Sequence, residues 1–223
     1  MADGRGLSNA DRAAKRLREM IFSGDLPAGT DHLETELAAK MGMSRTPVRE
    51  AIVSLAAQGL LEVRPRKGVR VASVSPSDMA EIYDILTELE SLAAANAAAA
   101  GLDEAALAPI EAIVEEMERA LAQEDRDAWA EADDRFHSAL ATLGGNARLA
   151  AIVAMMADQV RRARAVTLYM RPLPTGSNED HRAVVAAIAR GDAEAARATH
   201  RAHRLRAKAQ LLALLKRHRL AAL

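Results

Sequence analysis

Apolar side chains recur every three or four residues along the first sixty positions, and glycines interrupt the pattern. This period predicts three helices, from Asn9 to Ser23, from Leu33 to Lys40 and from about Arg45 to Gln58. Gly42 separates the second helix from the third, and Ser44 is a suitable N-cap for the third. Two helices joined in this way have the spacing of a helix-turn-helix.

Two short β-prone runs follow the third helix, from Leu60 to Val63 and from Val69 to Val74. The loop between them has the sequence RPRKG, in which proline and glycine favour a turn and three residues are basic. A β-hairpin with a basic tip after a helix-turn-helix indicates a wing. We expect the wing to lie along a groove or the backbone of DNA.

The hydrophobic pattern starts afresh at Ser75, which can act as an N-cap with Pro76 at the first helical position. Six further helices are predicted, at about 76–100, 103–124, 127–143, 147–169, 177–190 and 193–217. Their connections are short, so neighbouring helices are expected to be antiparallel in a bundle. The sequence therefore predicts a mostly α chain, with a winged helix-turn-helix in residues 1–74 and an all-helical domain in residues 75–223.

The amino-acid composition favours helix over sheet, because only 2% of residues are aromatic and alanine dominates beyond Leu92. No cysteine is present, which excludes a disulfide framework and leaves His, Asp and Glu as metal ligands. No stretch has the character of a signal peptide or of a membrane-spanning helix. We expect a soluble cytoplasmic protein with no membrane partner.

The net charge of −1 hides a difference between the two parts of the chain. Residues 1–72 carry 12 Lys and Arg against 9 Asp and Glu, whereas the remainder carries 18 against 22. A positive excess suits a polyanionic partner, although an excess of this size is common in globular domains. The stretch SRTPVRE is more specific, because the first turns of a recognition helix contact DNA. DNA contacts are predicted for Ser44, Arg45, Thr46 and Arg49.

Four ionisable side chains of the second part fall on helix faces that are otherwise apolar. Asp133 and His137 lie one turn apart in the stripe of one helix, and His181 and His203 lie among apolar residues of two later helices. A carboxylate that points into a core is costly unless it is paired or bound to a cation. These four residues can supply the ligands of Zn²⁺, or of Ni²⁺, Mn²⁺ or another divalent ion.

Two alternatives remain for the four residues. They can be core side chains that hydrogen-bond to one another, which is the commoner role of a lone buried histidine. They could also activate water in a metal-dependent hydrolase, although no further acid or base lies beside them in the pattern. His200 stands between Arg197 and Arg204 and is expected to be exposed, as are His32 and His218.

The segment from Ile21 to Val71, which includes SRTPVREAI and RPRKGVRV, resembles the winged helix-turn-helix of the GntR family of bacterial transcription regulators. The resemblance implies a DNA-binding regulator and not an enzyme. A homodimer is implied as well, because two copies related by a two-fold axis read the two halves of a palindromic operator. Arg66, Lys67 and Gly68 of the wing would approach the minor groove or the backbone. Repression is the preferred interpretation, and activation remains an alternative.

Residues 76–217 resemble the FCD domain of the FadR-type branch of this family, and six helices are more like its VanR-type subgroup. The resemblance rests on DDRFH (Asp133–His137), GGN (Gly144–Asn146), EDHRAVVAAIARGD (Glu179–Asp192) and His203. In many members of this family the matching Asp and His positions bind a divalent metal that helps to hold a small carboxylate. The resemblance therefore implies a small organic acid as effector.

One departure from the family pattern concerns this effector. If Glu90 is aligned with the family's glutamate, Leu86 stands where many members carry an arginine that faces the ligand. Either another basic residue compensates for the missing bidentate partner, or the ligand is less acidic. A regulator that responds to the metal itself is a further alternative. Effector contacts are predicted for Asn146, Arg161, Arg162 and Arg164.

Overall fold

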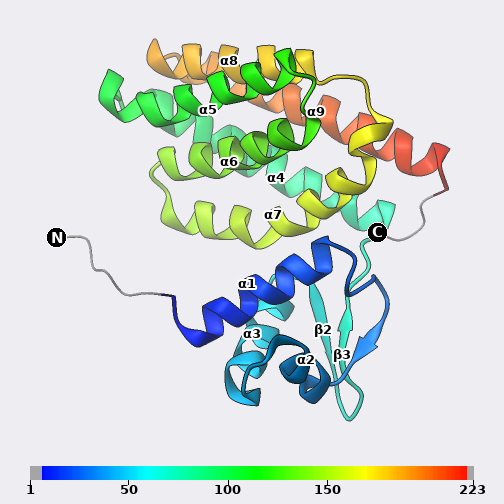
Figure 1. Cartoon of the computed structure of the whole chain (residues 1–223). Helices are drawn as coiled ribbons and strands as arrows, with labels where there is room; N and C mark the ends of the chain where they lie inside the picture. Colours follow the sequence, from blue (N-terminus) through cyan, green and yellow to red (C-terminus); the bar gives the residue numbers. More distant parts are fainter. Residues whose placement is uncertain (1–6, 220–223) are drawn as a thin grey trace. The chain divides into compact units, whose positions relative to one another are not determined.

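The computed structural model describes residues 7–219 of the chain (Figure 1). Contacts between Cα atoms divide the chain into two compact units, and the division falls between Val74 and Ser75. Within residues 7–219, no helix combines the length and the apolar character needed to cross a bilayer.

The first unit consists of three helices around a common core and a small sheet. The helices are α1 (Asn9–Phe22), α2 (Glu34–Met41) and α3 (Arg45–Ala57), and the strands are β1 (Asp31–His32), β2 (Leu61–Arg64) and β3 (Gly68–Val71). Gly42 ends α2 in the left-handed conformation, with φ of 64°, which turns the chain toward α3. The predicted helix-turn-helix and hairpin are therefore confirmed, with bounds within three residues of those expected.

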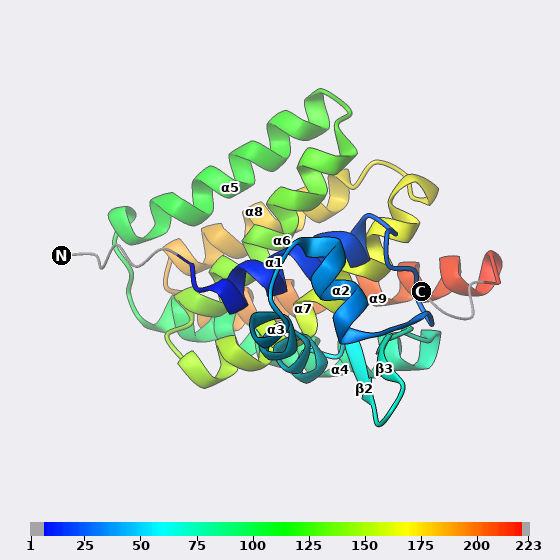
Figure 2. The same ribbon diagram turned by 60° about the horizontal axis from the view of Figure 1, so that its bottom comes forward.

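The sheet has the strand order β1-β3-β2, and both pairings are antiparallel. The sequence pattern did not predict β1, which pairs His32 with Val69. Gly68 allows this pairing, because its φ is +85° and an added Cβ would lie 2.2 Å from the carbonyl oxygen of His32. Figure 2 shows the β2–β3 hairpin projecting beyond the helices of its own unit.

The second unit is a bundle of six α-helices. They are α4 (Pro76–Ala99), α5 (Glu104–Ala122), α6 (Arg126–Leu143), α7 (Ala147–Thr167), α8 (Thr175–Ala189) and α9 (Ala193–Arg217), and a 3₁₀ turn, η1 (Leu168–Met170), follows α7. In this bundle α4 packs along α9, and α5 packs along α6 (Figure 1). The mostly α fold class and the six-helix prediction are confirmed, with the last predicted turn of α7 wound as 3₁₀ helix instead.

Side-chain caps determine where most of these helices begin. Ser75 and Asp78 form a capping box, in which Asp78 N donates to Ser75 Oγ and Ser75 N donates to Asp78 Oδ2. Helices α5, α6, α7 and α9 begin after side chains that accept backbone N–H groups of the first turn, namely Asp103, Asp125, Asn146 and Asp192. Each cap fixes the first residue of its helix.

Small residues bring α6 close to α4. A Cβ added to Gly144 at the end of α6 would lie 2.7 Å from Cα of Ala93 on α4. Real side chains do not approach a backbone so closely, so only glycine fits there. Ala93 follows Glu90 by about one helical turn, and Gly144 follows His137 by two. The contact therefore holds the helices that carry Glu90 and His137 at short range.

Candidate DNA-binding surface and metal centre

The predicted DNA-contacting residues of α3 lie at its first turns and are exposed. Ser44 is the N-cap residue, although its side chain makes no capping hydrogen bond. Arg45, Thr46 and Arg49 are all solvent-exposed, whereas Val48 is buried in the core of the unit. The helix thus presents one polar face at its start and anchors itself through the opposite face.

Arg49 has an acidic partner within its own unit. Its Nε lies 3.2 Å from Glu34 Oε2 at the start of α2, and 68% of the Arg49 side chain remains exposed. An exposed pair of this kind contributes little to folding because water screens it. The pair therefore orients the guanidinium without preventing its exchange to a phosphate or a base.

The wing residues lie at the tip of the β2–β3 hairpin. Arg66 and Lys67 are exposed, and Lys67 N donates to Arg64 O at 3.0 Å to close the turn. Arg66 adopts a positive φ of 65°. At the base of the hairpin, Arg70 donates two hydrogen bonds to Asp31, with distances of 2.9 and 2.7 Å. This pair fixes the hairpin against β1 and leaves the tip free.

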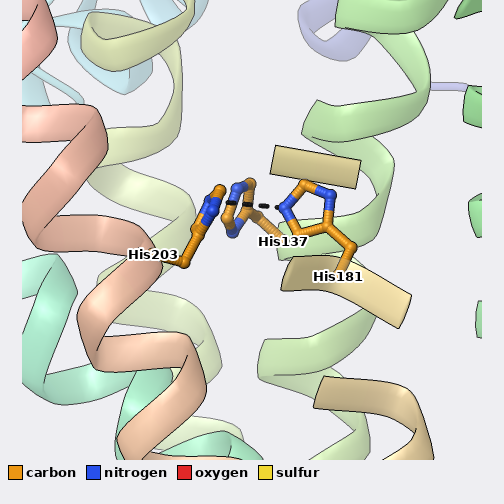
Figure 3. A group of neighbouring side chains, drawn as sticks. All are labelled: His137, His181 and His203. Atoms are coloured by element: carbon orange, nitrogen blue, oxygen red, sulfur yellow. Dashed lines mark hydrogen bonds between the residues drawn. The ribbon is translucent and has the colours of Figure 1, made fainter. Parts of the chain in front are cut away.

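In the helical unit, three histidines from three different helices converge. His137 of α6, His181 of α8 and His203 of α9 turn their rings toward one another (Figure 3). Ligand atoms of the three lie within 4.8 Å of one another. His181 Nε2 lies 3.3 Å from His203 Nε2 and 3.5 Å from Asp133 Oδ1, and His137 Nε2 lies 3.7 Å from Asp133 Oδ2. The four predicted ligands are thus brought together.

These distances fit the coordination shell of one small ion. Tetrahedral ligands at about 2.0–2.1 Å from a zinc ion are roughly 3.3–3.4 Å from one another. Several buried atoms here also lack a hydrogen-bond partner, among them Asp133 Oδ1 and His137 Nε2. Buried polar atoms are normally satisfied, and a cation would satisfy these. The residues present therefore fit a divalent metal.

A carboxylate sets the orientation of one of the rings, and another carboxylate lies beside a second ring. His203 Nδ1 donates to Asp180 Oδ2 at 3.2 Å, which leaves the Nε2 lone pair facing the centre. His137 Nδ1 lies 2.9 Å from Glu90 Oε2, although the angle between them is not that of a hydrogen bond. Burial lowers the pKa of His181 well below its usual value and also lowers that of His203. Both imidazoles are therefore neutral at neutral pH, which is the form that binds metals.

Asp133 is charged in spite of its burial. Burial alone would raise the pKa of this carboxyl, but the nearby Arg164 guanidinium outweighs that effect and holds the pKa below its usual value. Arg164 donates to Asp133 Oδ2 and also lies 3.3 Å from Asp134 Oδ1. Since Arg164 takes Oδ2, the unpartnered Oδ1 is the atom of Asp133 that a metal would use.

The expectation that His200 is exposed is wrong. Its side chain is fully buried, and His200 Nε2 donates to Glu90 Oε2 at 3.0 Å. Burial lowers the pKa of His200 to about 4. The inward face of α9 runs through Ala196, His200, His203, Arg204 and Leu211. The flanking arginines were misleading because Arg204 itself points inward.

Glu90, His137 and His200 form a second group that could hold a metal by geometry alone. Arg204 Nε, however, lies 3.4 Å from Glu90 Oε2, and both side chains are 2% exposed. Burial opposes the ionisation of Glu90, yet Arg204 and His137 hold its pKa well below the usual range. Glu90 Oε2 thus already faces His137, His200 and Arg204. Asp133 is also paired with a guanidinium, but its Oδ1 keeps no hydrogen-bond partner, so the group around Asp133 is the better metal site.

A cavity of about 300 Å³ opens beside His137, and we call it the α7 cavity. Its walls are mostly apolar and come from α4, α6, α7 and α9, with Leu86 among them. Of the predicted effector contacts, Arg161 and Arg164 line this cavity, whereas Asn146 and Arg162 are not among its lining residues. Asn146 caps α7 instead, where its side chain accepts from Arg148 N and Leu149 N.

Arg204 also lines the α7 cavity, and its sequence position gave no reason to expect this. Nε and Nη2 of Arg204 are buried without a hydrogen-bond partner. The guanidinium lies 4.7 Å from the centre of the Tyr83 ring. A basic side chain thus reaches the cavity from α9, and Leu86 of α4 is part of the same wall lining. The signal that could have found it is its spacing of eight residues from Ala196 and seven from Leu211, which lie on the buried face of α9.

Two family models match the chain in sequence order. Residues 9–71 match the family described as bacterial regulatory proteins, gntR family, and residues 81–207 match the FCD domain. An HTH-type transcriptional regulator in an unstable DNA locus of Streptomyces ambofaciens is 33% identical over 204 residues, which are 91% of this chain and 85% of that protein. The probable D-xylose utilization operon transcriptional repressor of Paenarthrobacter nicotinovorans is 35% identical over 179 residues, with 79% and 76% covered.

Solved structures show the same fold. E. coli McbR/YncC has a TM-score of 0.78 at 23% identity, with 92% of this chain and 98% of that chain covered. A putative transcriptional regulator GntR from Rhodococcus sp. RHA1 has a TM-score of 0.74 at 27% identity, with 93% and 99% covered. The family and the named relatives are transcriptional regulators and not enzymes, which removes the hydrolase alternative.

Proposed function

The chain belongs to the gntR family of bacterial regulatory proteins, with an FCD domain after its DNA-binding region, and we propose that it is a homodimeric repressor controlled by a small organic acid. The acid would bind in the α7 cavity beside a divalent metal, zinc in the first place, held by Asp133, His137, His181 and His203. The observation that carries the proposal is the convergence of four ligand groups, at spacings suited to one ion, next to that cavity.

DNA binding would use the exposed start of α3 and the tip of the hairpin. Arg45 and Arg49 have the fork geometry that reads guanine in the major groove or clamps a phosphate. Ser44 and Thr46 can donate to phosphate oxygens, and Arg66, Lys67 and Gly68 would follow the minor groove or the backbone. One such unit reads few base pairs. Two units related by a two-fold axis read a palindromic operator.

A bound metal would supply a Lewis-acidic position for one oxygen of the effector. The residues of the chain do the rest. His203 is oriented by Asp180, Asp133 keeps its charge through Arg164, and Arg161, Arg164 and Arg204 offer guanidinium groups to an acid. The effector would change operator affinity only if it binds the two dimer geometries with different affinity. A relative named as a probable operon repressor supports repression over activation.

Metal content and thermal unfolding test the site. Purified protein should contain about one divalent ion per chain, and a chelator should lower the Tm because the ion stabilises only the folded state. The His181→Ala variant should lose both the ion and the response to chelator, whereas a variant of the exposed histidine, His218→Ala, should keep both. Equal metal content in the two variants would contradict the assignment.

Operator selection from a random oligonucleotide pool tests the regulatory part of the proposal. The enriched sites should show two inverted half-sites, and a panel of small carboxylates should then shift operator affinity only in metal-loaded protein. A shift caused by metal alone, with no carboxylate effect, would favour a metal sensor. Failure to enrich any sequence would overturn the function and leave the metal measurement standing.

A further inference from the structure

A second cavity in the helical unit has an unusual lining, and we call it the arginine cavity. It measures about 40 Å³ and lies at the ends of α7 and α8, against α4, α6 and α9. Its residues are Tyr83, Arg126, Trp129, Ala130, Arg164, Leu168, Arg171, Pro172, Pro174, Ser177, His203, Arg204, Ala207 and Gln210. Four of these residues are arginines. No acidic residue lines the cavity within residues 7–219.

Two of these arginines have only neutral hydrogen-bond partners. Arg126 Nη1 donates to the carbonyl oxygens of Leu168 and Arg171, at 3.4 and 2.8 Å. Arg171 donates to Thr167 Oγ1, through Nε at 3.2 Å and through Nη2 at 2.5 Å. These bonds hold the guanidinium groups in place without neutralising their charge.

The other two arginines are each paired with carboxylates that do not line the cavity. Arg164 is paired with Asp133 and Asp134, and Arg204 lies near Glu90. Only 2% of the Arg204 side chain is exposed, and two of its donor atoms, Nε and Nη2, have no hydrogen-bond partner. A buried donor of a charged group that is left unsatisfied is costly, so an acceptor at these two atoms would be favourable.

Burial and a neighbouring positive charge make the charged form of Arg171 less favourable. Burial, followed by the charge of Arg164, lowers the pKa of Arg171 to about 10. A bound divalent ion next to His203 would add further positive charge at the edge of the same cavity. An anion inside the cavity is the group that would offset both.

We propose that the arginine cavity is an anion subsite, which takes one carboxylate or phosphate group between Arg171 and Arg204. Its volume corresponds to a few water molecules, at roughly 10–15 Å³ of cavity space each, so it admits a single oxyanion and not a whole ligand. Guanidinium forks match the planar or tetrahedral oxygens of such groups through paired hydrogen bonds. Ser177 and Gln210 add neutral polar side chains to the lining.

The subsite is separate from the α7 cavity, although Arg164 and Arg204 line both. An effector with two acidic groups could therefore place one group in each cavity. Only this last step rests on the proposed function, because anion binding itself requires neither DNA nor an effector.

Thermal unfolding of the full chain, without DNA and at constant ionic strength, tests the subsite. Inorganic phosphate and acetate are titrated in separate arms against sodium chloride. We expect one of them to raise the Tm in a saturable way, because a ligand that binds only the folded state stabilises it. The arm that responds identifies the oxyanion as phosphate or carboxylate.

The Arg171→Gln variant should lose this response, with apparent anion affinity reduced at least tenfold. Its Tm without anion should equal or exceed that of the wild type, because one of the crowded charges is gone. The control is Arg182→Gln, which removes an exposed guanidinium paired with Glu118 on the same unit. It should respond as the wild type does.

Three results would overturn the proposal. The first is a wild-type Tm that changes in neither arm at constant ionic strength. The second is an unchanged anion response in Arg171→Gln. The third is a Tm of that variant far below the wild type without anion, which would make Arg171 a structural residue.

Discussion

The two units of this protein place their charged groups in opposite ways. In the winged-helix unit the basic residues of α3 and of the hairpin tip are exposed, and the core below them is apolar. In the helical unit Glu90, Asp133, His200 and Arg204 lie in the interior of the bundle. The first arrangement suits a large polyanion that approaches from outside. The second suits a small ligand that must be surrounded.

This difference has an energetic consequence. An exposed arginine keeps its hydration and costs the fold little, so its loss affects binding and not stability. A buried charge is stable only with its partners, so its loss affects the fold first. Substitutions in the two units should therefore separate cleanly, and the four predictions below run from the largest expected effect to the smallest.

Glu90→Ala should have the largest effect on stability. It leaves Arg204 buried without its carboxylate, and the expected loss is about 3–5 kcal/mol in the free energy of unfolding. Chemical denaturation of the single variant and of Glu90→Met combined with Arg204→Leu measures this. The double variant should recover much of the loss. If the single variant is as stable as the wild type, the helical unit does not depend on its buried charges.

Arg45→Ala should have a large effect on DNA binding and not on stability. Operator affinity should fall by about 1–3 kcal/mol, on the order of 5- to 150-fold, through loss of a base or phosphate contact. The Tm should not change, because Arg45 is exposed. Fluorescence anisotropy with a labelled operator measures the affinity. The exposed Arg16 of α1 serves as a matched control, and an equal loss in Arg16→Ala would point to a general charge effect.

Gly144→Ala tests the packing that brings the buried groups together. The added methyl group meets the backbone of Ala93, so about 1–3 kcal/mol of stability should be lost. Metal affinity should fall as well, because α6 carries Asp133 and His137. Gly145→Ala would be strained by its φ of +70° but meets no atom. A loss of metal affinity in that variant alone would contradict the packing explanation.

The smallest effect concerns a surface pair of the winged-helix unit. The hydrogen bonds from Arg70 lower the pKa of Asp31 to about 2, from a usual value of 3.8. A carboxyl whose folded-state pKa is depressed stabilises the fold above its unfolded pKa and loses that contribution as the pH falls. The loss should occur between about pH 4 and pH 2. An NMR titration of Asp31 measures the pKa, and Arg70→Met should return it toward 3.8.

Helix positions in both units followed from sequence because apolar periodicity and caps are local properties. The strand β1 did not, since Asp31 and His32 become a strand only by pairing with β3, almost forty residues away. The inward positions of Asp133, His137, His181 and His203 also followed from periodicity. Whether they meet depends on how three helices, α6, α8 and α9, pack together, which no single helix specifies.

The charged residues of the bundle were harder to predict. His200 was expected to be exposed because it stands between Arg197 and Arg204, although a spacing of four places His200 and Arg204 on one face, which is buried. Arg126 and Arg171 gave no signal, because they lie at a helix start and in a connection. Their role in lining a cavity arises from the meeting of α6 with the chain after α7.

The close fit of Gly68 against His32 divides the hairpin into a fixed part and a variable part for protein engineering. Residues 65–67 are exposed and pack against nothing in the core. A library that varies these three positions could therefore search for new operator preferences at little risk to folding, provided that Gly68 stays constant. Asn, Asp or Gly would be the favoured choices at position 66, where the backbone has a positive φ.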